Sequence, residues 1–214
     1  MSDEKNDNPD ADTIRNMLPL RMTSTVVRGF GRGSTDLGIP TANLDRTAIK
    51  VYQATTTTTG TEAARDSTSD YSVQMIKFDD LPCGIYWGFC RIGEKLANDE
   101  GGGDGAIVYK TAVSIGFNPT YNNKEKTIEP HLIAPPKDSR RHASSCGETL
   151  MGEFYDQPIR LSVVGYLRPE APFEGLEKLI EAIKGDIVNA EIMGDSTDSA
   201  IIAEKEWVAE EPEA

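Results

Sequence analysis

The chain reads Val-Val-Arg-Gly-Phe-Gly-Arg-Gly-Ser at residues 26–34, directly after a segment from Leu20 that is rich in β-branched residues. The β-branched segment predicts a strand, whereas three glycines within five positions lose too much backbone entropy for regular structure. Consecutive glycine amides can form a concavity that binds phosphate, but a sharp hairpin loop has the same composition. Neither the Walker A spacing nor Gly-x-Gly-x-x-Gly is fulfilled, so both interpretations stay open.

The next segment, residues 38–43, reads Gly-Ile-Pro-Thr-Ala-Asn. Thr41 and Asn43 are two positions apart, so in an extended segment their side chains point to the same side. Their neutral oxygens suit a hard cation such as Mg²⁺ if nucleotide phosphates supply the negative charge. Hydrogen bonding within a turn is the commoner role of such a pair, and these two residues alone leave both roles open.

A third polar segment, Thr-Ile-Glu-Pro-His at residues 127–131, carries a carboxylate in a β-like stretch. Pro130 favours an extended conformation for Glu129. A carboxylate that is held near a hydroxyl can accept its proton while the hydroxyl attacks phosphorus, although most glutamates are simply exposed. His131 falls on the same strand face, and we expect it to pack or to form a hydrogen bond rather than to catalyse.

Further strand candidates follow one another at short spacing, with glycine and proline between them. They lie at residues 84–92, 106–115, 127–133 and 159–167. This pattern predicts an antiparallel barrel or sandwich. Residues 53–70 contain five consecutive threonines and residues 95–105 contain a glycine run, so both segments look like loop insertions.

One helix is well marked near the C-terminus. Apolar residues from Leu176 to Ile187 recur at helical spacing, which places them on one face that can cover the barrel. Beyond residue 190 the apolar pattern weakens, although Ile201, Ile202 and Trp207 could form a short extra helix.

The net charge of −13 is concentrated at the ends of the chain: residues 1–12 contribute −4 and residues 191–214 contribute −7. A chain without a basic face is a poor partner for nucleic acid. Three cysteines without a close pair suit a reducing compartment. No apolar run is long enough to span a bilayer, and no targeting segment is visible. We therefore expect a cytoplasmic protein.

Taken together, these segments resemble the riboflavin kinase (flavokinase) family in its monofunctional, eukaryotic form. The similarity extends from residue 20 to residue 190, and its most specific part is the Pro-Thr-Ala-Asn segment that follows the Gly-Arg-Gly loop. The matching blocks are residues 26–34, 37–44, 84–88, 113–119, 129–132 and 164–170.

The resemblance implies a six-stranded antiparallel Greek-key barrel with a C-terminal helix packed on it. It implies ATP-dependent phosphorylation of the riboflavin 5′-hydroxyl to give FMN and ADP, with Glu129 as the catalytic base. Thr41 and Asn43 are implied as ligands of Mg²⁺, with Zn²⁺ or Mn²⁺ as alternatives. Arg168 and Phe173 are implied in a flap over the flavin ring. The residues implied at ATP are Gly29, Gly31, Arg32, Gly33, Thr35, Asn118 and Tyr155.

The expected organisation is one barrel domain at residues 20–190 between a disordered acidic tail at 1–19 and an acidic tail or short helix at 191–214. We expect a monomer whose partners are riboflavin and ATP, with no nucleic acid and no membrane span. A flavin- or nucleotide-binding module without catalysis is one alternative, but it would need neither the metal ligands nor the base. An FAD-forming enzyme is another, but residues 1–19 are too short for the extra nucleotidyltransferase domain.

Two departures from the family pattern stand out. Related sequences often carry a lysine after Gly-Arg-Gly-Ser, where this chain has Thr35 and then Asp36. The segment Phe-Tyr-Asp-Gln at residues 154–157 replaces the usual Phe-Tyr-Gly-Glu. The first departure removes a lysine contact to phosphate from the expected site.

Overall fold

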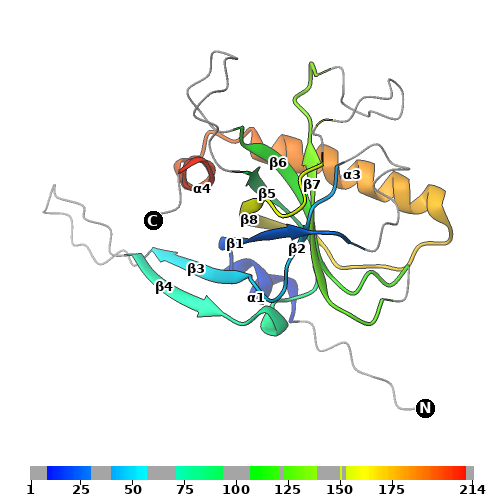
Figure 1. Ribbon diagram of the computed structural model, residues 1–214, viewed down its shortest axis with the longest axis horizontal. Helices are drawn as coiled ribbons and strands as arrows, with labels where there is room; N and C mark the ends of the chain where they lie inside the picture. Colours follow the sequence, from blue (N-terminus) through cyan, green and yellow to red (C-terminus); the bar gives the residue numbers. More distant parts are fainter. Residues whose placement is uncertain are drawn as a thin grey trace, which may run out of the picture.

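The computed structural model of the protein describes residues 9–29, 40–56, 71–93, 107–120, 123–138, 150 and 153–210. In this part of the chain the strands form an antiparallel, barrel-like body that carries helices on its outside (Figure 1). The described helices are also not long and apolar enough to cross a membrane.

The described residues form eight strands in a single sheet. These are β1 Leu20–Val27, β2 Asn43–Leu44, β3 Lys50–Thr56, β4 Tyr71–Ile76, β5 Gly84–Ile92, β6 Tyr109–Gly116, β7 Thr127–Ile133 and β8 Pro158–Arg168. They pair in the order β4-β3-β1-β8-β5-β6-β7, and β2 pairs with β1. A 3₁₀ turn, η1 Phe78–Asp80, precedes β5.

A short contact between β7 and the segment leading into β2 makes this sheet barrel-like. An isolated antiparallel bridge joins Thr41 to His131, and the amide of Ala42 donates to the carbonyl of Pro130 at 3.0 Å. Around the ring, β1, β2, β7, β6, β5 and β8 therefore follow one another. The expected antiparallel barrel with a C-terminal helix is confirmed. Its closure is a single bridge rather than a full ladder, and β3 and β4 extend the sheet beyond β1.

The interior of the barrel is filled by alternate residues of the strands. Tyr86, Val113, Ile128 and Leu161 are each at most 1% exposed. Because successive side chains of a strand point to opposite faces, the residues between these positions face outward. The outer face of the strands is therefore available for helices and for polar groups.

Helix α3, Leu176–Gly194, covers the outer face of β5 and β6. Ile187 and Ala190 pack there in one buried cluster with Trp87, Phe89 and Ala112. β5 is thus buried on both faces, which explains its nearly continuous apolar sequence. The helix predicted from the apolar spacing is confirmed, and it continues seven residues beyond Ile187.

Helix α4, Ser199–Ala209, is fastened by polar groups to the outside of the strands. Arg21 donates to both carboxylate oxygens of Glu204 at 3.0 and 2.9 Å, and Ser162 donates to the same carboxylate at 2.7 Å. Arg91 and Arg160 donate to backbone carbonyls at the C-terminal end of the helix, where the helix dipole favours positive charge. Four polar strand residues therefore hold α4.

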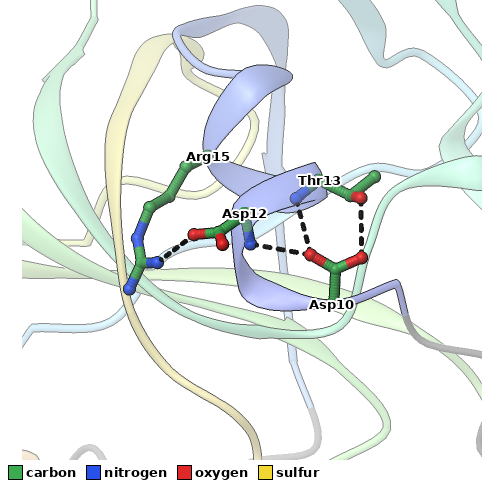
Figure 2. Close-up of polar contacts among 4 residues, drawn as sticks. All are labelled: Asp10, Asp12, Thr13 and Arg15. Atoms are coloured by element: carbon green, nitrogen blue, oxygen red, sulfur yellow. Dashed lines mark hydrogen bonds and ion pairs between the residues drawn. The ribbon is translucent and has the colours of Figure 1, made fainter.

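Helix α1, Ala11–Asn16, begins at a side-chain cap that Figure 2 shows. Asp10 accepts hydrogen bonds from the amides of Asp12 and Thr13, each at 3.0 Å, and from the Thr13 hydroxyl at 2.8 Å. One turn later Ile14 is 1% exposed and belongs to the barrel core. Within residues 1–19, which we expected to be disordered, this short helix is ordered because a cap and one apolar anchor act together.

The strands β3 and β4 were not predicted. Residues 53–56 lie in β3 although we expected a loop insertion from residue 53, and threonine, being β-branched, favours strands when a partner is present. Residues 57–70 and 95–105, the remainder of the two expected insertions, lie outside the described residues. β3 is stabilised by pairing with β1 and β4, and composition alone does not indicate these partners.

We predict that Asp10→Ala lowers the melting temperature at pH 7 by a few degrees, because α1 loses its cap. Hydrogen bonds from the amide and hydroxyl of Thr13 lower the pKa of Asp10 from its ordinary 3.8. The carboxylate therefore stabilises the fold at neutral pH, and this contribution is lost as the pH falls through the folded-state pKa. Melting curves from about pH 7 to about pH 2 should show the two proteins converging. Asp12→Ala is the control, because it removes only an exposed ion pair with Arg15. An equal decrease in the melting temperature of this variant would contradict a capping role for Asp10.

We predict that Glu204→Ala lowers the free energy of unfolding by about 3 kcal/mol, because Arg21 and Ser162 lose a buried acceptor. Urea denaturation followed by tryptophan fluorescence measures the change. Glu206→Ala, an exposed position on the same helix, should change stability by less than about 0.5 kcal/mol. Equal effects of the two substitutions would show that the carboxylate does not fasten α4.

Candidate active site

Three expected site residues and the neighbouring His131 lie on the outer face of the barrel, at its closure. Thr41, Asn43, Glu129 and His131 are each half-buried, whereas Ala42 between the first two is fully buried. The alternation of extended chains places Thr41 with Asn43 and Glu129 with His131. The bridge between Thr41 and His131 brings the two pairs to the same side.

The side chains at the bridge are in direct contact. The hydroxyl oxygen of Thr41 lies 2.7 Å from Nδ1 of His131. Burial lowers the pKa of His131 to about 4, so its imidazole is neutral at pH 7. A neutral imidazole has one donor and one acceptor nitrogen. His131 thus makes a hydrogen bond, as predicted from the sequence.

Asn43 and Glu129 occupy facing positions across the same closure. Two residues onward from Thr41 and two residues back from His131, the antiparallel register sets Asn43 opposite Glu129. The hydroxyl of Thr127 donates to Oε1 of Glu129 at 2.9 Å, which orients the carboxylate. The structure therefore brings the two expected metal ligands and the expected base to one surface.

The glycine loop begins directly against this surface. A Cβ added to Gly29 would lie 2.3 Å from Nδ2 of Asn43, closer than any real side chain allows. A larger residue at position 29 would force the side chain of Asn43 to move, so glycine lets the backbone pass close to that amide. The expected phosphate-loop residues that follow lie outside the described residues; they are Gly31, Arg32, Gly33 and Thr35.

Tyr155 lies beside the start of the same loop. The guanidinium carbon of Arg28 is 4.2 Å from the centroid of the Tyr155 ring. The amide of Asp156 donates to the carbonyl of Val26 at 2.8 Å, which ties this turn to β1. Asp156 has a φ of 63°, a conformation that the usual glycine of the motif adopts more easily. Asp156, which replaces the usual glycine of the family, thus keeps the backbone conformation of this turn.

The expected flavin residues lie together at the end of β8. Arg168 donates to both carboxylate oxygens of Asp186 in α3 at 2.9 and 2.7 Å. Its guanidinium carbon lies 5.5 Å from the centroid of the Phe173 ring. Because Asp186 is only 6% exposed, the ion pair is shielded from water. Arg168 is therefore anchored to the helix while it lies against Phe173.

The same flap segment is held to the end of β6. The carboxylate of Glu170 accepts hydrogen bonds from the amides of Phe117 and Asn118 at 3.1 and 3.0 Å. Burial raises the pKa of Glu170, while these hydrogen bonds act in the opposite direction. Asn118, which was expected at ATP, makes its described contact with the flap. Its role at ATP stays a prediction.

Two residues of this arrangement were missed from the sequence. Asp186 interrupts the apolar face of α3 between Ile183 and Ile187, and a charge in that position signals a buried partner. Glu170 lies within a recognised block, but nothing in the sequence indicated that its carboxylate would bind two amides. Its role depends on β6 and β8 ending at the same edge of the barrel.

The oxygen donors at the closure fit a hard divalent cation. Thr41 offers a hydroxyl oxygen and Asn43 an amide oxygen, both suited to Mg²⁺. The described part of the chain holds no group of three or more His, Cys, Asp or Glu that could bind a metal by itself. The positive charge of a cation bound here would therefore be balanced mainly by the phosphates of a substrate.

Comparison with known proteins gives consistent matches. The chain matches the Flavokinase family model, described as riboflavin kinase, over residues 16–193. The riboflavin kinases of Mus musculus and Homo sapiens are 36% and 35% identical over 173 residues, 81% of this chain and 79% of each relative. A bifunctional riboflavin kinase/FMN phosphatase of Arabidopsis thaliana is 36% identical over 181 residues, 83% of this chain but 35% of that protein.

Among solved structures, a riboflavin kinase from Trypanosoma brucei matches with a TM-score of 0.47 and 19% identity, covering 84% of this chain and 82% of that one. The family model and the sequence relatives are the stronger findings. They span the barrel, the closure and the flap together. On these grounds the chain belongs to the riboflavin kinase family.

Proposed function

We propose that this chain carries out the reaction of its family by direct transfer: the terminal phosphate of ATP passes to the 5′-hydroxyl of riboflavin, which gives FMN and ADP. The observation that supports this mechanism best is the shared outer face of Thr41, Asn43 and Glu129 at the barrel closure. Phosphoryl transfer depends mainly on positioning and charge neutralisation, and these three groups suit that task.

In this mechanism Glu129 is the catalytic base. Thr127 holds its carboxylate in a fixed direction, so the riboflavin hydroxyl can donate its proton to it. The hydroxyl oxygen forms a bond to the γ-phosphorus while the bond from that phosphorus to the ADP oxygen breaks in line. Because the proton passes to Glu129 and ADP leaves with the bonding electrons, no covalent phosphoenzyme is needed.

Thr41 and Asn43 are the residues that would hold Mg²⁺, and Zn²⁺ or Mn²⁺ could take the same oxygen ligands. When bound, the ion supplies neutralisation of the phosphate charge. The contribution of the chain is to fix two neutral oxygens at the barrel closure, opposite the base. The close approach of Gly29, the first residue of the glycine loop, to Asn43 supports a phosphate beside these ligands.

We assign the nucleotide to the side of the closure where the glycine loop begins. Gly29 and Tyr155 are the described residues on this side. The same assignment includes four further residues of the expected phosphate loop, Gly31, Arg32, Gly33 and Thr35. A cytoplasmic location and a monomeric state stay predictions.

We assign the flavin to the flap, where Phe173 and the guanidinium of Arg168 offer flat surfaces for an isoalloxazine ring. Asn118 stays proposed at ATP, and its backbone amide, like that of Phe117, donates to Glu170 of the flap. Arg168 at one end of the flap is fixed to Asp186 of α3, and the amide of Phe173 at the other end donates to the hydroxyl of Thr120, beyond β6. A segment anchored in this way can hold an aromatic ring in a fixed orientation.

We predict that the wild-type protein forms FMN from riboflavin, ATP and Mg²⁺, and that Glu129→Gln lowers kcat roughly a hundredfold or more because the base is lost. Separation of FMN from riboflavin by liquid chromatography measures turnover. Binding of ADP, measured by calorimetry, should survive the substitution.

Glu125→Gln, an exposed glutamate just before β7, is the matched control and should leave kcat unchanged. Near-normal turnover of Glu129→Gln would remove Glu129 from the role of base. Binding of both substrates without any FMN from the wild type would instead identify a binding module, and FAD among the products would reveal a second activity.

We predict that Phe173→Ala weakens riboflavin binding about tenfold, because the flap loses its aromatic surface. The quenching of riboflavin fluorescence measures this affinity. The affinity for ADP should not change. Leu176→Ala removes an apolar side chain that is 44% exposed nearby. If this control weakened riboflavin binding as much, Phe173 would have no special role.

A further inference from the structure

Thr41 and His131 are joined by a side-chain hydrogen bond in addition to the backbone pairing of their segments. The backbone already joins the two segments, since Ala42 donates to Pro130 at 3.0 Å and Leu132 donates to Pro40 at 2.8 Å. The side-chain contact of 2.7 Å adds a second connection between the same residues that form the bridge. The backbone bonds already close the barrel at this point, so the side-chain bond is open to a role at the Thr41 hydroxyl.

A hydroxyl can bind a cation only with its lone pairs. Thr41 has one hydroxyl hydrogen and two lone pairs on the same oxygen. A cation is repelled if the hydrogen points toward it, so the hydrogen must be directed at another acceptor. Nδ1 of His131 lies at the right distance for this role. The imidazole accepts the hydrogen when its own proton is on Nε2.

We propose that His131 is a positioning residue for the metal: its Nδ1 accepts the Thr41 hydroxyl hydrogen and leaves the oxygen lone pairs directed to the cation. The inference rests on the proposed role of Thr41 as a metal ligand. It assigns His131 no contact with ATP or riboflavin. Partners that orient metal ligands in this way typically change metal affinity by about 10- to 100-fold when they are removed.

The geometry distinguishes this role from that of a base. Glu129 is two residues away on the same strand face, and its carboxylate is oriented by Thr127 rather than by His131. Nδ1 of His131 is already engaged by the Thr41 hydroxyl. His131 therefore acts on the reaction through Thr41, and its removal should be visible in metal-dependent binding before any chemistry occurs.

The test compares three single variants and one double variant by calorimetric titration with ADP, once with MgCl₂ and once with EDTA. His131→Leu keeps the size of the side chain but has no acceptor, whereas His131→Asn retains an oxygen near the position of Nδ1. Thr41→Val removes the hydroxyl and keeps the shape. Circular dichroism before each titration establishes that the variants are folded.

We expect His131→Leu to weaken ADP binding in Mg²⁺ by at least about tenfold and to leave binding in EDTA unchanged. His131→Asn should recover most of the loss. In Thr41→Val, the added change His131→Leu should have little further effect, because the hydroxyl that it orients is absent.

The outcomes separate the two proposals. If Thr41→Val loses the Mg²⁺ dependence and His131→Leu keeps it, the positioning role is wrong and the metal assignment stands. If Thr41→Val keeps the full Mg²⁺ dependence, both the metal assignment and the inference fall. Equal weakening by His131→Leu in Mg²⁺ and in EDTA would indicate a purely structural role and would also overturn the inference.

Discussion

The pairing of residues 40–44 with two strands at once is the constraint on which the fold and the site both depend. β2 pairs with the end of β1 on one side, and the segment just before it is bridged to β7 on the other. One short extended segment thus joins two edges of the sheet. Because Thr41 and Asn43 occupy its outward positions, the contact that closes the barrel also assembles the polar surface.

Helix α3 connects this surface to the flap. It covers the outer face of the barrel, where Ala112 and Ile133 belong to the same buried cluster as Ile187. The polar part of β7 continues on that face toward Glu129. Asp186 of the same helix accepts two hydrogen bonds from Arg168, at the start of the flap. One helix therefore covers part of the outer face and also anchors Arg168.

The family match covers residues 16–193, so α4 and nearly all of α1 lie outside it. Both helices are nevertheless joined to the barrel by specific contacts. Ile14 of α1 enters the core, and Glu204 of α4 pairs with Arg21 of β1. The arginines that bind α4 are strand residues. The surface on which α4 packs is therefore part of the barrel, although α4 itself lies outside the family match.

The sequence by itself determined the elements whose pattern is local. β5 and β7 were predicted with their observed ends, and the apolar spacing after Leu176 predicted α3. We did not predict β3 and β4, because they flank a threonine-rich stretch that resembles a loop insertion and their pairing partners are not named by the sequence. The sequence also could not predict which residues of different strands face each other. Thr41 and His131 are separated by 90 residues, and they are in contact because the barrel closes there. Alternation decides which side chains share a face of a strand, but the tertiary structure decides which strands meet.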